Sequence, residues 1–143
     1  MATERVLLVD DEVEFLTALA ERLRTRGLEV EVATNGNDAI AMAGKKTFHA
    51  VVLDYAMPGL DGIETLKALL EHDPNMQVML LTGQATIRAA VEATRMGAVD
   101  VLEKPTDVTT LLEKISEARA RHLAAVEQRS QDQVDDILRK RGW

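Results

Sequence analysis

The sequence predicts an α/β fold, a doubly wound parallel sheet with helices on both faces. Short apolar runs alternate about five times with stretches whose apolar residues recur every three or four positions, and this alternation of strands with helices indicates a parallel sheet. Most of the runs are continuous and end at acidic residues or at Gly and Pro, which is typical of strands buried on both faces. Right-handed crossovers then bring the carboxyl ends of all the strands to one edge of the sheet.

The strands are expected at the apolar runs, which are residues 6–9, 28–33, 50–53, 77–81 and 99–102. The second run alternates polar and apolar side chains, so it predicts a half-exposed strand at the edge of the sheet. Helices are expected over residues 12–26, 39–43, 61–70 and 87–94 and from residue 108 onward. Asp61 and Glu64 have the spacing of a capping box at the start of the third helix.

Composition excludes several classes of function. A chain of 143 residues has the size of one domain, and its aromatic content of 3% argues against a stacking platform for single-stranded nucleic acid. The net charge is −7 and no dense basic cluster is present, so we expect no direct contact with nucleic acid. Cysteine is absent, which excludes disulfides and thiolate chemistry. No signal peptide and no apolar run long enough to span a membrane is present, so the cytoplasm is the expected location and no membrane partner is expected.

Polar residues follow four of the predicted strands. Asp10 and Asp11 end the first, Asp54 the third, Thr82 the fourth and Lys104 the fifth. Ligands of open α/β sheets bind at this edge. Taken alone, Asp54 is a nucleophile, a metal ligand or an acidic loop residue, but the coincidence at equivalent places in one fold favours a site.

The chemistry of this set favours a cation and a phosphoryl group. Two carboxylates about 4 Å apart repel by roughly 4 kcal/mol at an effective dielectric constant of 20, and Mg²⁺, which accepts a few carboxylates together with phosphate oxygens, removes this repulsion. Lys104 supplies a positive charge and Thr82 a hydroxyl donor for a phosphoryl group, and Asp54 would be the nucleophile of aspartyl-phosphate chemistry. The first strand is followed by acidic residues in place of a glycine-rich loop, which excludes the usual nucleotide sites.

Four segments together resemble the receiver domain of response regulators from bacterial two-component systems. They are Val-Asp-Asp-Glu at 9–12, Leu-Asp-Tyr-Ala-Met-Pro-Gly-Leu-Asp-Gly at 53–62, Leu-Leu-Thr-Gly at 80–83 and Gly-Ala-Val-Asp-Val-Leu-Glu-Lys-Pro at 97–105. The resemblance covers residues 4–123, and the chain is most similar to receivers attached to transcription activators. It implies a flavodoxin-like sheet of five strands in the order 2-1-3-4-5.

The resemblance also implies roles for individual residues. Asp54 would be the phosphoacceptor, and Mg²⁺ would be bound by Asp10, Asp11, Asp54 and the backbone carbonyl of Ala56. Thr82 and Lys104 would contact the phosphoryl group and couple it to the surface. The peptide bond between Lys104 and Pro105 is expected to be cis, as is usual in this family.

Partners follow from the same resemblance. A sensor histidine kinase or a phosphotransfer protein would donate the phosphoryl group, and a downstream effector or an output domain beyond this chain would read the change at the surface of the fourth helix, fifth strand and fifth helix. No enzyme activity is expected beyond slow self-phosphorylation from small donors and slow loss of the phosphoryl group to water.

The residues leave two other functions open. Val101 stands where receivers commonly carry an aromatic switch residue, so a phosphorylation-independent interaction scaffold is the main alternative. A Mg²⁺-dependent phosphatase would also form an aspartyl phosphate, but Ala56 occupies the position where those enzymes carry a second Asp.

The domain division is expected at residue 123, with a receiver domain over 1–123 and a charged, helical tail over 124–143. Apolar residues recur through the tail every three or four positions, interrupted by Ser130. The tail is either a solvated helix that frays or a helical extension that pairs in a homodimer.

Overall fold

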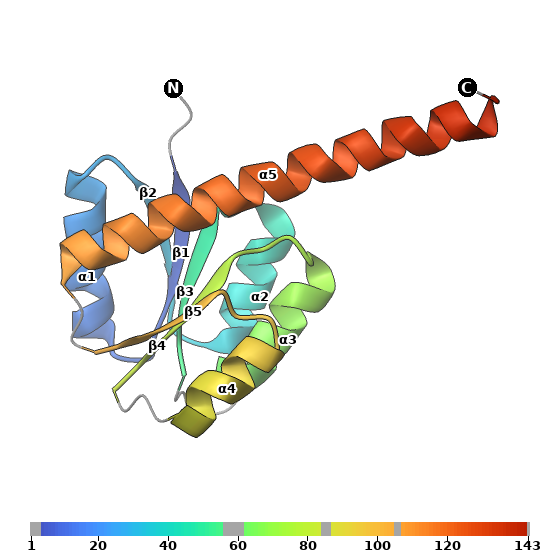
Figure 1. Ribbon diagram of the computed structural model, residues 1–143. Helices are drawn as coiled ribbons and strands as arrows, with labels where there is room; N and C mark the ends of the chain where they lie inside the picture. The colour runs from blue at the N-terminus through green and yellow to red at the C-terminus, as the bar shows by residue number, and fades with distance from the viewer. Residues whose placement is uncertain (1–3, 56–61, 84–86, 105–106, 143) are drawn as a thin grey trace.

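The protein is a five-stranded parallel sheet with helices on both faces, in a computed structural model that describes residues 4–55, 62–83, 87–104 and 107–142 (Figure 1). The strands lie in the order β2-β1-β3-β4-β5. The elements in chain order are β1 (Arg5–Val9), α1 (Val13–Thr25), β2 (Glu29–Ala33), α2 (Gly36–Lys45), β3 (Ala50–Asp54), α3 (Gly62–His72), β4 (Val78–Thr82), α4 (Ile87–Arg95), β5 (Asp100–Glu103) and α5 (Val108–Lys140). Both the strand order and the α/β class agree with the sequence prediction.

The central strands form as the apolar runs predicted, because their side chains are buried on both faces of the sheet. β2 lies at the edge and is partly exposed, as its alternating pattern indicated. β3 and β4 each extend one residue beyond the predicted run, so Asp54 and Thr82 are the last residues of these strands. The proposed capping residue Asp61 lies outside the described residues, and α3 begins at Gly62.

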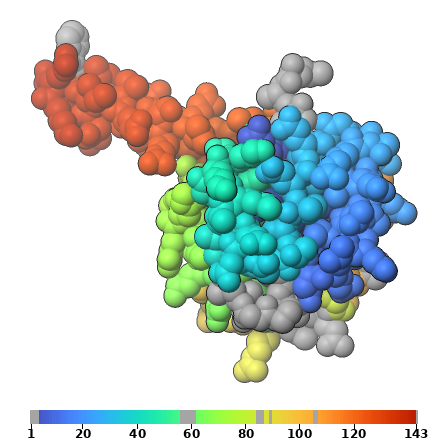
Figure 2. Space-filling model, turned by 180° about the vertical axis from the view of Figure 1, so that it is seen from behind, coloured from blue at the N-terminus to red at the C-terminus, as the bar shows by residue number. Residues whose placement is uncertain are grey.

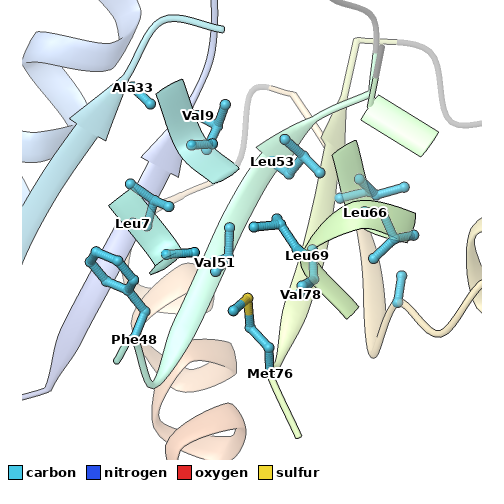
Figure 3. Close-up of a cluster of buried hydrophobic side chains, with 14 of the residues drawn as sticks. Leu7, Val9, Ala33, Phe48, Val51, Leu53, Leu66, Leu69, Met76 and Val78 are labelled. Carbon is cyan, nitrogen blue, oxygen red and sulfur yellow. The ribbon is translucent and has the colours of Figure 1, made fainter. Parts of the chain in front are cut away.

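Two apolar clusters attach the helices to the sheet. One cluster joins β1, β3 and β4 to α2, α3 and α4, and Figure 3 shows its side chains, among them Leu53, Leu66 and Leu69, directed into the space between strands and helices. The other lies on the opposite face and packs α1 and α5 against the sheet through residues such as Leu23 and Ile115. Burial of about 1.5–3 kcal/mol per large aliphatic side chain drives this packing.

Helix α5 is far longer than the others. It crosses one face of the sheet and then projects beyond the body of the protein (Figure 1; Figure 2, red). Its buried residues are Leu111, Ile115, Ala118 and His122. The helix extends without interruption through residues 124–140, where the sequence predicted a helical tail; the domain boundary at residue 123 stays a prediction.

A pair of histidines connects α5 to the sheet at the amino end of β3. The rings of His49 and His122 are T-shaped at 5.6 Å between centroids, and the backbone N–H of Arg5 donates to Nδ1 of His49 at 2.9 Å. Burial and the neighbouring charges of His122, Arg119 and Arg5 lower the pKa of the His49 imidazole, and the smaller opposing effect of Glu29 does not reverse this.

We expect His49 to make the fold less stable in mild acid. A base whose pKa is lower in the folded state takes up its proton on unfolding, so stability is present above the unfolded pKa of about 6.5 and is lost as pH falls through the folded pKa. His49→Gln, which retains an acceptor for Arg5, should therefore lose less stability than wild type between about pH 7.5 and 5.5 in urea unfolding. The matched change at the exposed His72 should leave the wild-type pH dependence in place.

Candidate functional site

Three carboxylates meet at the carboxyl edge of the sheet. Asp10, Asp11 and Asp54 each offer an oxygen atom within 4.8 Å of the others. Asp10 and Asp54 are 3% and 5% exposed, whereas Asp11 is exposed to solvent. Among the described residues this is the only group of three or more metal-ligating side chains.

The sheet fixes the two buried carboxylates. Asp10 directly follows β1, and its backbone N–H donates to the carbonyl of Ala33 at the end of β2 at 3.1 Å. Its Oδ1 accepts the backbone N–H of Glu12 at 2.9 Å, which orients the carboxylate at the start of α1. Asp54 is paired in register with Leu81 of β4, and the preceding Leu53 with Val9 of β1, so the strands on both sides fix the end of β3.

Lys104 reaches into the acidic group from the end of β5. Its Nζ donates to Oδ2 of Asp10 at 2.6 Å and lies 3.6 Å from Oδ1 of Asp54 and 3.5 Å from Oε1 of Glu12. The ammonium also lies 4.6 Å from the centre of the Phe15 ring. Burial alone would lower the pKa of Lys104, but the hydrogen bond with Asp10 and the charges of Asp54, Asp10 and Glu12 outweigh it, so the pKa is raised and the side chain stays charged.

Thr82 completes the set predicted from the sequence. It is the buried last residue of β4, and its carbonyl accepts the backbone N–H of Lys104, which directly follows β5, at 2.7 Å, so the two residues lie close together. The structure thus brings Asp10, Asp11, Asp54 and Lys104 together and places Thr82 beside Lys104 at the same edge of the sheet.

Some predicted features lie outside the described residues. They are the backbone carbonyl of Ala56 and the peptide bond to Pro105. Val101, at the position of the usual aromatic switch, is described: it is half-buried and packs against the apolar cluster shared by β1, β3 and β4. An aliphatic side chain at this place acts as part of the core.

Three further residues shape the site and were not singled out from the sequence. Glu12 adds a carboxylate beside Lys104, and Phe15 lies against the same ammonium. Gly62 passes so close to β3 that a Cβ atom there would lie 2.6 Å from the carbonyl oxygen of Asp54. In the sequence, Phe15 has only the spacing of an apolar helix position, and Gly62 is the last residue of the segment at 53–62 that resembles receivers.

The group carries an excess of negative charge. Asp10, Asp11, Glu12 and Asp54 contribute four carboxylates and Lys104 one ammonium, which leaves a formal charge of −3. A pair of carboxylates separated by 4.8 Å repels by roughly 3–4 kcal/mol at an effective dielectric constant of 20. A hard divalent cation bound by oxygen ligands relieves this repulsion, so the arrangement is suited to such an ion.

The fold and the site define a class, doubly wound α/β domains with an acidic cluster at the carboxyl edge of the sheet. Within this class, the family model of the response regulator receiver domain matches the sequence over residues 6–116. The chain therefore belongs to the response regulator receiver family, the phosphoacceptor switches of two-component systems.

Relatives and solved structures agree with this assignment. The chain is 39% identical over 115 residues to the transcriptional regulatory protein ZraR of Klebsiella oxytoca, covering 80% of this chain and 26% of that protein. It is 38% identical over 117 residues to the C4-dicarboxylate transport transcriptional regulatory protein DctD of Pseudomonas aeruginosa, covering 82% and 25%. A CheY-like receiver domain protein from Methanospirillum hungatei has a TM-score of 0.82 at 28% identity, with 87% of this chain and 99% of that one covered.

The chain spans about a quarter of the length of these curated relatives. The described part of the chain contains no helix with the length and apolar character needed to cross a membrane.

Proposed function

We propose that Asp54 is the phosphoacceptor of this receiver domain. The observation that carries the proposal is the placement of its buried carboxylate within 4.8 Å of Asp10 and Asp11 and 3.6 Å from the ammonium of Lys104. An oxygen of Asp54 forms the bond to phosphorus as the bond from phosphorus to the donor breaks, and the donor atom leaves with that electron pair.

We assign Asp10, Asp11 and Asp54 as the residues that hold Mg²⁺, because their oxygen donors and uncompensated negative charge suit a hard cation that keeps free positions for phosphate oxygens. The backbone carbonyl of Ala56 is proposed as a further ligand. When bound, the ion supplies charge neutralisation for the incoming phosphoryl oxygens. Asp11 is exposed, so its carboxylate is accessible to an ion in solvent.

Lys104 and Thr82 contact the phosphoryl group once it is attached to Asp54. The ammonium is held by Asp10 at 2.6 Å and lies 3.6 Å from Asp54, so it is close enough to supply a positive charge to a phosphoryl group on Asp54. Thr82 supplies a hydroxyl from the adjacent strand. The backbone N–H of Lys104 donates to the carbonyl of Thr82, so we expect a displacement of either residue to shift the other.

The partners follow from this assignment. A sensor histidine kinase or a phosphotransfer protein is the proposed donor, and a downstream effector or output domain reads the change. Ile87 and Val91 of α4 are exposed apolar side chains that line a shallow hollow with Ala90, Thr94 and Arg95, and this face is the proposed reading surface together with β5 and α5. The curated relatives named above are transcriptional regulators, which favours an output domain of that kind.

Incubation with acetyl phosphate and Mg²⁺ tests the assignment. We expect the intact mass to rise by one phosphoryl group in wild type and to stay unchanged in Asp54→Asn, because the amide lacks the nucleophilic oxygen. Asp132→Asn, which makes the same change at an exposed position of α5, should gain the phosphoryl group as wild type does. Omission of Mg²⁺ should slow the reaction in both reactive proteins.

A wild-type mass that does not change, or an equal change in Asp54→Asn, would contradict the assignment. The first outcome would favour the phosphorylation-independent scaffold, and the second would place the modification on another residue.

A further inference from the structure

Phe15 places its ring against the ammonium group of Lys104. The Nζ atom of Lys104 lies over the ring, 4.6 Å from its centre. The face of an aromatic ring carries partial negative charge, so it attracts a cation, and the attraction is stronger where water is excluded. The Lys104 side chain is only 14% exposed, so little water separates the ammonium from its neighbours. The ring therefore contributes to the forces that fix the position of the ammonium.

The ring itself is held by the first turn of α1. Phe15 is half-buried and packs against the apolar cluster that joins α1 and α5 to the sheet. The same side chain lines a small cavity together with Asp10 and Asp54, so the ring borders the space beside the two buried carboxylates. Packing against the core thus determines where the ring lies relative to the site.

The other neighbours of the ammonium change during the proposed reaction. Asp10, at 2.6 Å, is a proposed ligand of Mg²⁺, and Asp54, at 3.6 Å, gains the phosphoryl group. Glu12 lies at 3.5 Å, but its side chain is 66% exposed, so solvent weakens its attraction for the ammonium. The ring of Phe15 has no formal charge and binds neither the metal nor the phosphoryl group. Its attraction for the ammonium therefore does not depend on which of these groups is bound.

From this arrangement we propose that Phe15 is a positioning residue for phosphoryl transfer, whose ring holds the ammonium of Lys104 beside Asp54 while the carboxylates around it exchange partners. The proposal rests on the assignment of Asp54 as the phosphoacceptor and extends it to a residue outside the polar set. A residue that served only the core would supply apolar volume at this place, and the ring would have no effect on the reaction.

Removal of the ring tests the proposal through the rate of phosphoryl uptake. Phe15→Leu keeps an apolar side chain but lacks the ring face, so uptake from acetyl phosphate with Mg²⁺ should slow about three- to tenfold, which corresponds to about 0.6–1.4 kcal/mol. Phe15→Tyr retains the ring face and should stay within about twofold of wild type. The intact mass, followed over time, gives the three rates.

Phe48→Leu is the matched control, because it makes the same change at the other phenylalanine of the chain. Phe48 is 1% exposed and packs in the apolar cluster on the opposite face of the sheet from Phe15. Its substitution should lower the free energy of unfolding through lost packing and leave the rate of uptake by the folded protein unchanged. The control thus separates effects on stability from effects on the reaction.

A double-mutant cycle with Lys104→Met tests whether the ring acts through the ammonium. Without the ammonium the ring has no cation to hold, so Phe15→Leu should change the rate by less than about twofold when it is added to Lys104→Met. If Phe15→Leu slowed uptake by the same factor in both backgrounds, the ring would act through packing alone, and the positioning role would be overturned.

Fluorine resonances report the contact independently of the reaction. Protein in which both phenylalanines carry a 4-fluoro group should give two resonances, and Phe15→Leu identifies the one that belongs to Phe15. In Lys104→Met, recorded with Mg²⁺, the Phe15 resonance should move because a nearby charge is removed, and the Phe48 resonance should stay in place. A Phe15 resonance that does not move would overturn the contact.

The two measurements distinguish failure of this proposal from failure of the phosphoacceptor assignment. Wild-type uptake on Asp54 with an equal rate in Phe15→Leu, or slow uptake by Phe15→Tyr, would overturn the positioning role and leave the assignment in place. A wild-type protein that takes up no phosphoryl group would overturn the assignment and the positioning role together, even with the fluorine shift present.

Discussion

Lys104→Met is expected to lower the free energy of unfolding by about 3–5 kcal/mol in buffer free of divalent metal. The ammonium of Lys104 donates to the buried carboxylate of Asp10 at 2.6 Å and lies 3.6 Å from that of Asp54. Removing the cation leaves these carboxylates desolvated and next to each other, which costs far more than the loss of one exposed ion pair. Urea unfolding in the presence of EDTA measures the difference.

Lys114→Met is the matched control. Lys114 also forms an ion pair, at 3.1 Å from Asp100, but both side chains are about one-third exposed. An exposed pair contributes about 0–1 kcal/mol, so this variant should stay close to wild type. Equal losses in the two lysine variants would mean that the acidic site does not depend on Lys104.

Lys104→Met also separates the binding of Mg²⁺ from the uptake of the phosphoryl group. Lys104 and a divalent cation both neutralise Asp10 and Asp54, so the variant should be stabilised by Mg²⁺ more than wild type is, measured as the shift in thermal midpoint. Phosphoryl uptake should nevertheless be slower, because the positive charge for the phosphoryl oxygens is lost. A variant that binds Mg²⁺ more weakly than wild type would contradict this account of the competition.

The sequence was sufficient to predict the sheet and most of the site because both follow from topology. Strands such as β3 and β4 are buried on both faces, so they are apolar throughout and end where the side chains become polar. In a parallel sheet those ends share one edge, so Asp54 and Thr82 had to meet the residues that follow β1 and β5. The resemblance to receivers added the order of the strands.

The sequence could not predict contacts that depend on how far a side chain extends and in which direction. The pairing of Lys104 with Asp10 depends on which of several nearby carboxylates the ammonium reaches, and the approach of Phe15 depends on the angle at which α1 leaves the sheet. Glu12 stands at the start of a predicted helix, where an acidic residue is common, so nothing in the sequence indicated its contact with Lys104. For α5, apolar spacing predicted a helix but did not distinguish a solvated tail from a paired one.

Gly62→Ala is expected to destabilise the protein by about 1–3 kcal/mol and to slow phosphorylation of Asp54. Gly62 begins α3 directly against the end of β3, and its N–H donates to the carbonyl of Tyr55 at 3.1 Å. A Cβ atom there would lie 2.6 Å from the carbonyl oxygen of Asp54 and from two backbone atoms of Tyr55. These are main-chain atoms that cannot rotate away, so relief of the clash must displace the end of β3 or the start of α3.

The control is Gly44→Ala, in which the new methyl group meets nothing within 4 Å. Gly44 lies within α2, where alanine should add about 0.5–1 kcal/mol of stability. The two substitutions should change the free energy of unfolding in opposite directions in urea, and only Gly62→Ala should take up the phosphoryl group more slowly. That result would locate the effect at the contact with β3. If Gly62→Ala were as stable and as reactive as wild type, the close approach of α3 to Asp54 would have no part in positioning the phosphoacceptor, and the strands alone would hold it.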